Sequence, residues 1–314
     1  MEKKQLFNPT KTIITDIQTS ANITIAQLKY NCNEVANIIS LENAFKNNYV
    51  IIKEMVQQRV NSVELENLSN SYIFILDGDM IKGAKQNRVI NTSILVAPKG
   101  TAIIPVSCVE EGRWEETDED FDYSMDIAHN SIRYSKLNHI NNKSSLEFDF
   151  QANQRNVWNN VEEIIHCLDV KSPTNSHTDT YKQLDDELVS STSNFDINEE
   201  SNGILILVNN KIISCEIFNN KKLYSDYFNK ILVSAAMEAK MKKINHTIEK
   251  LDAEKINNKL VNMFKEYQNN IDNVKSNQAV CEGDEMRLNC NDRAFYGLVF
   301  FNEAIHKNVQ IKLD

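Results

Sequence analysis

The sequence predicts an α+β protein. We expect an antiparallel, β-rich N-terminal half, either a sandwich or a curled sheet, and a C-terminal half that mixes hairpin strands with three or four helices. Two observations predict this fold class. Short apolar stretches bounded by Asn and Ser recur through the N-terminal part, and the apolar period becomes helical from about residue 153.

The same two patterns suggest how the chain is divided. We expect a β-rich region over 1–120, an acidic loop and connector over 121–152, and a mixed helix and strand region over 153–314. The C-terminal strands can also return to the first sheet, in which case the whole chain is one continuous domain.

Five short stretches of the N-terminal half predict strands, because each alternates or runs apolar between polar residues. They are TIITDI (12–17), NITIAQL (22–28), YVIIKEMV (49–56), NSVELENL (61–68) and SYIFILDG (71–78). The stretch LENAFKNN (41–48) predicts a short helix between the second and third strands.

Residues 83–114 predict a hairpin with a polar open end. Pro98, Lys99 and Gly100 fit a loop in which Pro begins a type I turn and Gly takes the left-handed conformation of a bulge. The expected register pairs Ala97 with Thr101, Ile94 with Ile104, Thr92 with Val106, Ile90 with Cys108, Arg88 with Glu110, and Gln86 with Gly112. Because side chains alternate faces along a strand, these residues share one face, with the polar pairs at the mouth.

The C-terminal half carries helical and hairpin patterns in turn. The helical face that begins near residue 153 consists of Val157, Val161, Ile164, Ile165 and Leu168. Further helices are predicted over 179–190, 221–245 and 253–270, and strands over 293–301 and 308–313. GILILV and KIISCEIF, joined by Asn209 and Asn210, predict a hairpin with a type I′ turn.

Composition excludes some classes of function. The net charge of −10 argues against a protein that binds duplex nucleic acid or an anionic membrane surface. The first residues lack the apolar core of a signal peptide, and no apolar run is long enough to span a bilayer. The six cysteines are scattered without a CxxC pair, so we expect reduced thiols in a cytoplasmic protein.

No metal site or cofactor is indicated. The acidic stretch 115–122 lacks the spaced ligands and turn glycine of a calcium loop, so we expect a solvated loop there. The histidines do not occur in HxxxH or HExxH spacing, and neither a phosphate-binding loop nor GxGxxG is present.

The hairpin mouth is the candidate ligand-binding site. Arg88 and Arg113 can hold a phosphate, Glu110 can accept hydrogen bonds from ribose hydroxyls, and Trp114 offers a ring for stacking. Lys85 adds positive charge in a glycine-containing turn. The alternative is structural: an ion pair closes the end of the sheet and Trp114 covers the core.

Catalytic roles are open at four positions. Asp77 and Asp79 flank Gly78 and can act as acid and base or hold Mg²⁺, although Asp-Gly-Asp is also ordinary turn composition. Glu110 can act as an acid or base. Cys108 shares a face with apolar residues, which favours a buried core thiol over a nucleophile.

Several of these segments together resemble a known family, the ADP-ribosylglycohydrolase- and rhodanese/phosphatase-superfamily-associated protein domain. The segments are DGDMIKGAKQNR, PVSCVEEGRW, Trp158, NGILILVNNKIISCEIF and Ile305-His306. The most specific positions are Gly83, Lys85, Gln86, Asn87, Arg88, Cys108, Val109, Glu110, Gly112, Arg113 and Trp114. Asp79 stands where the family pattern leads us to expect Glu. The resemblance implies an association with ADP-ribose chemistry and no particular reaction.

Three functions follow as hypotheses. The preferred one is binding or sensing of ADP-ribose or a related NAD-derived nucleotide at the hairpin mouth, with Gln86 or Glu110 on the ribose. The second is a hydrolase of the same class of substrate. The third is a non-catalytic module in which exposed apolar residues on 221–245 dock a protein partner from ADP-ribose metabolism.

Overall fold

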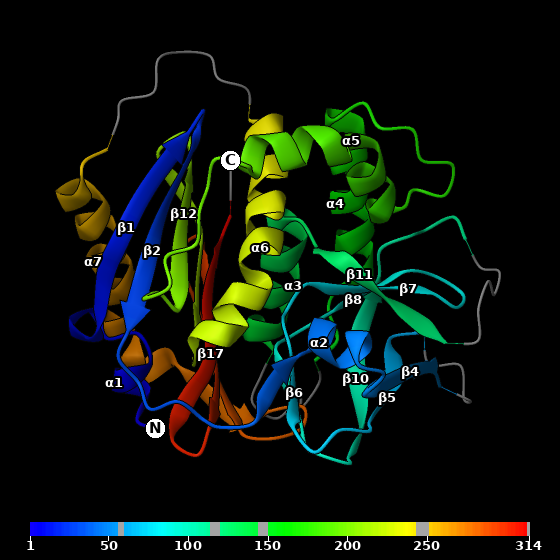
Figure 1. Cartoon of the computed structure of the whole chain (residues 1–314), viewed down its shortest axis with the longest axis horizontal. Helices are drawn as coiled ribbons and strands as arrows, with labels where there is room; N and C mark the ends of the chain where they lie inside the picture. Colours follow the sequence, from blue (N-terminus) through cyan, green and yellow to red (C-terminus); the bar gives the residue numbers. More distant parts are fainter. Residues whose placement is uncertain (56–59, 114–119, 144–149, 243–250, 313–314) are drawn as a thin grey trace.

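The computed structural model describes residues 1–55, 60–113, 120–143, 150–242 and 251–312 (Figure 1). The helices are α1 (Lys3–Leu6), α2 (Leu41–Lys46), α3 (Asn130–Asn142), α4 (Gln154–Cys167), α5 (His177–Thr192), α6 (Lys221–Met241) and α7 (Ala253–Asn269). Two 3₁₀ turns lie at Pro9–Lys11 and Ile271–Asn273. Strands are concentrated in the N-terminal half and the longer helices follow them, so the predicted α+β class is confirmed.

The largest sheet joins strands from both ends of the chain. Its order is β1 (Thr12–Ser20), β2 (Ile23–Tyr30), β12 (Gly203–Val208), β13 (Lys211–Phe218), β17 (Glu303–Ile311), β16 (Arg293–Phe300), β15 (Asp284–Cys290) and β14 (Lys275–Gln278). Every neighbouring pair is antiparallel. The division into regions stays a prediction, but one sheet spans the first and the last of them.

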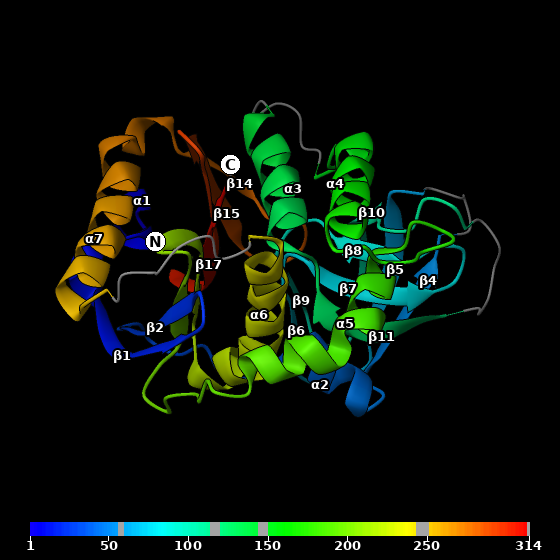
Figure 2. The same ribbon diagram turned by 90° about the horizontal axis from the view of Figure 1, so that it is seen from above.

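Helices cover both faces of this sheet. Helix α7 lies on one side, and α3 and α6 lie on the other, where they separate the sheet from the rest of the molecule (Figure 2). Asp252 caps α7 by accepting a hydrogen bond from the Lys255 N–H at 2.8 Å. The apolar stripe of α7 is then buried against the sheet, including Ile256, Leu260 and Phe264.

A second, curled sheet is built from the middle of the N-terminal half. Its order is β11 (Phe121–Ile127), β7 (Asp79–Gly83), β8 (Arg88–Ile90), β10 (Thr101–Cys108), β5 (Ser62–Asn67) and β4 (Val50–Glu54). A bridge between Lys53 and Asp120 brings its two outer ends together. The curl encloses a core that includes Ile52, Leu65 and Ile104. A small sheet of β3 (Ile38–Ser40), β6 (Tyr72–Ile75) and β9 (Ile94–Val96) lies beside it, with β3 and β6 parallel.

The expected register of the 83–114 hairpin is wrong. Ile90 pairs with Val106 and Arg88 with Cys108, a shift of two residues that keeps the same face. Beyond Ile90 the strands part, because β9 pairs with β6 and β10 pairs with β5. At the turn, Lys99 rather than Gly100 takes the positive φ, at 56°. Pairing with distant strands has therefore replaced the local hairpin that the sequence favours.

The C-terminal hairpin follows its prediction. Val208 pairs with Lys211, and Asn209 and Asn210 between them have φ of 49° and 63°, as a type I′ turn requires. The predicted helices near 154, 179, 221 and 253 are also present, although α4 ends at Cys167, before the expected Ser172-Pro173 stop.

The connector expected over 121–152 contains ordered elements instead. It holds β11, the outer strand of the curled sheet, and the thirteen-residue helix α3. Helix α3 has no clear apolar stripe because its buried side includes Arg133, Lys136 and Asn141. In the part of the chain that the structure describes, no helix combines the length and apolarity needed to cross a membrane.

Candidate functional site

The polar residues of the expected hairpin mouth do lie together, but inside the protein. The Arg88 side chain is 0% exposed. Its Nη1 donates to Gln86 Oε1 at 3.0 Å and to Cys108 Sγ, and its Nη2 donates to Glu54 Oε1 at 2.9 Å. The guanidinium thus links β8 to β4 across the curled sheet.

Glu110 forms an adjoining buried network. Its Oε2 accepts from the Asn87 backbone N–H at 3.2 Å and from Arg113 Nε at 2.9 Å, while Oε1 accepts from Thr174 Oγ1 at 2.9 Å. Arg113 Nη1 also donates to the Ala84 carbonyl at 2.8 Å. Burial raises the pKa of Glu110, but the bonds from Arg113, Thr174 and Asn87 outweigh it and hold that pKa below its usual value. Glu110 is therefore charged at neutral pH.

These groups, which we call the hairpin network, are bonded mainly to one another. Gly112 also lies against the loop before α5, where its N–H donates to the Thr174 carbonyl at 2.8 Å. Lys85 is half-buried in the turn between β7 and β8, and Trp114 lies outside the described residues. Neither of the two cavities described below is lined by Arg88 or Glu110. A ligand-binding role for these residues stays a prediction.

Cys108 is a core thiol. It is 1% exposed and lies on β10. Burial raises its pKa, and the opposing effect of Arg88 does not reverse this. The group stays protonated at neutral pH, which does not favour a nucleophile.

Asp77 and Asp79 contact different partners, and a catalytic role for them stays a prediction. Gly78 between them has φ of 93°, and the Asp79 N–H donates to the Leu76 carbonyl at 3.0 Å, as in a turn. Asp77 accepts from Lys136 at 2.9 Å, whereas Asp79 accepts from the Tyr227 hydroxyl at 2.8 Å. Over the described ranges, no cluster of three or more His, Cys, Asp or Glu side chains could hold a metal ion.

A second buried network ties α3 to the large sheet. Arg133 Nη1 lies 2.7 Å from Glu216 Oε1, and Glu216 Oε2 lies 2.8 Å from Nε2 of His306. The other ring nitrogen of His306 is 3.0 Å from Ser93 Oγ. His306 lies on β17, which is an inner strand between β13 and β16. The His306 side chain is fully buried, and each of its ring nitrogens has a hydrogen-bonding partner.

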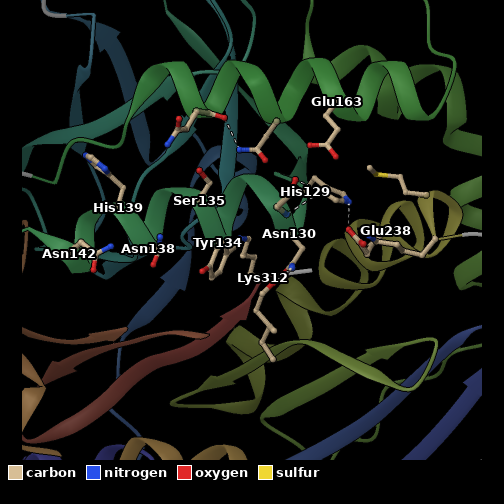
Figure 3. Close-up of a pocket in the computed structure, with 16 residues that line it drawn as sticks. His129, Asn130, Tyr134, Ser135, Asn138, His139, Asn142, Glu163, Glu238 and Lys312 are labelled. Carbon is tan, nitrogen blue, oxygen red and sulfur yellow. Dashed lines mark hydrogen bonds and ion pairs between the residues drawn. The ribbon is translucent and has the colours of Figure 1, made fainter. Parts of the chain in front are cut away.

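A cavity of ≈ 350 Å³ opens on the other side of α3, and we call it the α3 cavity (Figure 3). It is bounded by α3, α4, α6 and the end of β17. Hydrogen-bonding side chains dominate its lining, among them His129, Ser131, Ser135, Asn138, Asn156 and Glu238. Tyr134 and Lys312 add an aromatic ring and a positive charge.

His129 and Glu238 form a buried pair at this cavity. Nε2 of His129 lies 2.9 Å from Glu238 Oε2, with the two side chains 0% and 3% exposed (Figure 3). Burial raises the pKa of Glu238, but the interaction with His129 and the nearby charges outweigh it and place that pKa below its usual value. The carboxylate is therefore ionised and lies beside Nε2 at an ion-pair distance.

The N-terminus of α3 fixes the tautomer of His129. His129 is the N-cap residue, and its Nδ1 accepts the Ser131 backbone N–H at 3.2 Å. A nitrogen that accepts this bond carries no proton, so a proton on the ring is carried by Nε2, the nitrogen beside Glu238, where the alignment does not meet that of a hydrogen bond. Nδ1 is also 2.9 Å from the Ser131 hydroxyl oxygen.

His177 positions the backbone of His129. Its Nε2 accepts the His129 backbone N–H at 3.1 Å, and the side chain is fully buried. Burial, with a contribution from His129, lowers the pKa of His177 to about 3. His177 is therefore neutral at ordinary pH and remains able to accept the bond that positions His129.

Sequence reasoning missed this cavity. The histidines do not occur in a metal-binding spacing, so His129 did not stand out, and 121–152 was expected to be a connector. One local signal was present: Asn130 and Ser131 are residue types that favour a helix N-terminus, although the observed N-cap is His129. Glu238 lies on α6, far along the sequence, and only the tertiary structure brings it to His129.

The fold and cavity define an α+β protein in which helices between a large sheet and a curled sheet carry a polar pocket. In a comparison with protein families, the ARG and Rhodanese-Phosphatase-superfamily-associated Protein domain (ARPP-1) matches residues 11–310. The chain belongs to this family, as the sequence resemblance implied. No curated protein and no solved structure matches the chain.

Proposed function

We propose that this protein binds or senses ADP-ribose or a related NAD-derived nucleotide, and that the ligand occupies the α3 cavity. The α3 cavity itself carries the proposal, because its ≈ 350 Å³ lie within the range of small-ligand pockets and its lining consists mostly of hydrogen-bonding groups. The family's name, which contains ARG, supports the choice of ligand class.

The charges around the cavity suit a diphosphate. A second cavity adjoins the first and shares Ile311 and Lys312 with it. Lys211, Lys259 and Arg293 also line this second cavity, with Glu266 as its one acidic residue among those described. We place the phosphates beside Lys312, where the two cavities meet, because lysine binds phosphate as a point charge.

The remaining parts of a nucleotide have matching groups in the α3 cavity. Tyr134 is half-buried on α3 and offers a ring face for the base. Asn138 and Asn156 carry both donors and acceptors, which suits ribose hydroxyls. The ligand would then lie along α3, with its phosphates toward the end of β17.

Calorimetric titration of the purified protein with ADP-ribose, NAD and cyclic ADP-ribose tests the proposal. We expect heat of binding with at least one of them, and a loss of about tenfold in affinity, equal to about 1.4 kcal/mol, in Lys312→Gln. Lys222→Gln, an exposed change at the start of α6, is the matched control and should bind normally. No heat with any nucleotide in the folded protein contradicts the proposal.

The two other hypotheses are affected differently by the structure. A hydrolase remains compatible with the α3 cavity, and the His129–Glu238 pair bears on it directly. A docking surface on 221–245 is less favoured, because from Lys221 to Lys242 every apolar residue is buried or half-buried. Residues 243–245 lie outside the described ranges.

A further inference from the structure

We propose that Ser131 is a nucleophile, with His129 as its general base and Glu238 as the residue that orients the imidazole, and that the α3 cavity hydrolyses carboxylic esters. The specific substrate, an acyl group esterified to a ribose hydroxyl of the nucleotide, depends on the proposed nucleotide binding. The serine chemistry does not depend on it.

The geometry supports each role. Ser131 Oγ is 2.9 Å from Nδ1 of His129, within the range that a base needs to take a hydroxyl proton. The opposite ring nitrogen is 2.9 Å from the Glu238 carboxylate. The order carboxylate, imidazole, hydroxyl is that of serine hydrolases, with the two ring nitrogens exchanged. The carboxylate holds the imidazole as an ion-pair partner, since Nε2 is not aligned for a hydrogen bond with it.

The three groups differ in exposure as the chemistry requires. His129 and Glu238 are buried, which strengthens the interaction between them and holds the ring in one orientation. Ser131 is only half-buried and lines the α3 cavity, so an ester carbonyl can reach its oxygen. Because Nδ1 must stay unprotonated to accept the Ser131 N–H, the resting tautomer is the one that a base needs.

The reaction balances without a cofactor. Ser131 Oγ adds to the ester carbonyl carbon while its proton passes to His129 Nδ1. The tetrahedral intermediate expels the alcohol oxygen, which receives that proton, and leaves an acyl-serine. Water then attacks the acyl-serine, gives a proton to Nδ1, and the carboxylic acid departs as Ser131 regains its proton.

Helix α3 adds electrostatic support. Ser131 lies in its first turn, and the helix runs for thirteen residues from Asn130 to Asn142. The backbone N–H groups at the start of a helix carry partial positive charge, which favours the negative oxygen of the tetrahedral intermediate. The Ser131, Ile132 and Arg133 N–H groups already donate to His129, so this support comes from the helix dipole as a whole.

A fluorophosphonate probe tests the serine chemistry in the full chain. We expect the probe to add once per molecule, with the modified peptide containing Ser131 by mass spectrometry. Ser131→Ala should abolish labelling. Ser190→Ala is the control, since Ser190 is an exposed serine on α5 and is not among the residues that line the α3 cavity; it should label normally.

Two further variants separate catalysis from structure. Asn is a strong N-cap residue, so His129→Asn keeps a cap on α3 but removes the base. We expect its labelling rate to fall by at least about a hundredfold while thermal melting stays close to wild type. Glu238→Gln should lower the rate by about tenfold or more, and an unchanged rate in a folded variant would contradict the orienting role.

The outcomes distinguish this proposal from nucleotide binding. Labelling at Ser131 together with release of acetate from O-acetyl-ADP-ribose supports both. Labelling and cleavage of p-nitrophenyl acetate, without cleavage of the ADP-ribose ester, keeps the serine chemistry and rejects the substrate. Binding of ADP-ribose with no labelling of folded wild-type protein, or equal labelling of Ser131→Ala, overturns the nucleophile.

Discussion

The hairpin network and the α3 cavity both hold an ionised carboxylate beside a basic side chain, yet their surroundings differ. In the hairpin network, Glu110 is enclosed by Arg113, Asn87 and Thr174, and every bond that it accepts stabilises the fold. In the α3 cavity, Glu238 lies beside an imidazole whose other nitrogen is within hydrogen-bond distance of a half-buried hydroxyl. A buried charged side chain therefore does not by itself indicate a ligand-binding site. A charged side chain that lines a cavity does.

The largest expected effect is on the hairpin network. Arg88→Met removes the buried partner of Glu54 and the donor to Gln86. Because removing one member of a buried ion pair leaves an uncompensated charge, the free energy of unfolding should fall by about 3–5 kcal/mol in urea denaturation. Lys53 is the neighbour of Glu54 on β4 and forms an exposed ion pair with Asp120. Lys53→Met breaks this pair and should cost about 1 kcal/mol or less. Equal losses in the two variants would show that Arg88 is not a structural anchor.

The same chemical change in the two regions should have unequal consequences for stability. Glu110→Gln removes the charge that Arg113 faces and should lower the free energy of unfolding by about 1.5–3 kcal/mol. Glu238→Gln removes the charge beside His129, where no hydrogen bond joins the two side chains, and should cost about 1 kcal/mol. Chemical denaturation at pH 7 measures both, and the reverse order would contradict the contrast between the regions.

Acid should weaken the fold through the support of the α3 cavity. His177 has a pKa of about 3 in the folded chain against an ordinary value of 6.5, so between these limits the unfolded chain binds a proton that the folded chain does not. Its contribution to stability is complete above pH 6.5. It is lost as the pH falls toward 3, by up to about 1.4 kcal/mol per pH unit.

The variant His177→Gln isolates this effect, since its amide oxygen can accept the His129 N–H without titrating. The difference in free energy of unfolding between wild type and variant should shrink by about 1–2 kcal/mol between pH 7 and pH 5. A difference that does not change with pH would mean that His177 does not titrate in this range.

The smallest effect is expected from the serines of the α3 cavity. Ser135→Ala should change the free energy of unfolding by no more than about 0.5 kcal/mol, and Ser131→Ala by about 1 kcal/mol or less. Thermal melting measures both. A loss of several kcal/mol in Ser131→Ala would place Ser131 among the structural residues and remove the contrast with the hairpin network.

Sequence patterns predicted the local elements better than their pairing. The turn at Asn209 and Asn210 and the apolar stripe of α7 depend on neighbours along the chain, and both are present as expected. The hairpin of residues 83–114 depended on which strands find each other. There the distant strands β5 and β6 displaced part of the local pairing.

The candidate sites show the same limit. The sequence grouped Arg88, Glu110 and Arg113 by their residue types. The structure does bring them together, with Gln86 bonded both to Arg88 and to the Glu110 carbonyl. Their burial could not be predicted, because the loop that holds Thr174 arrives from the second half of the chain. Helix α3 was missed because Arg133 and Lys136 face inward, where they meet Glu216 and Asp77.

By itself, the sequence determined the α+β class, most of the helices, the type I′ hairpin and the family, since these follow from local periodicity, turn chemistry and short motifs. Only the tertiary structure decided which polar residues are enclosed and which reach a cavity. The physical reason is that burial and ionisation are set by groups that pack from distant segments, as Glu238 does against His129.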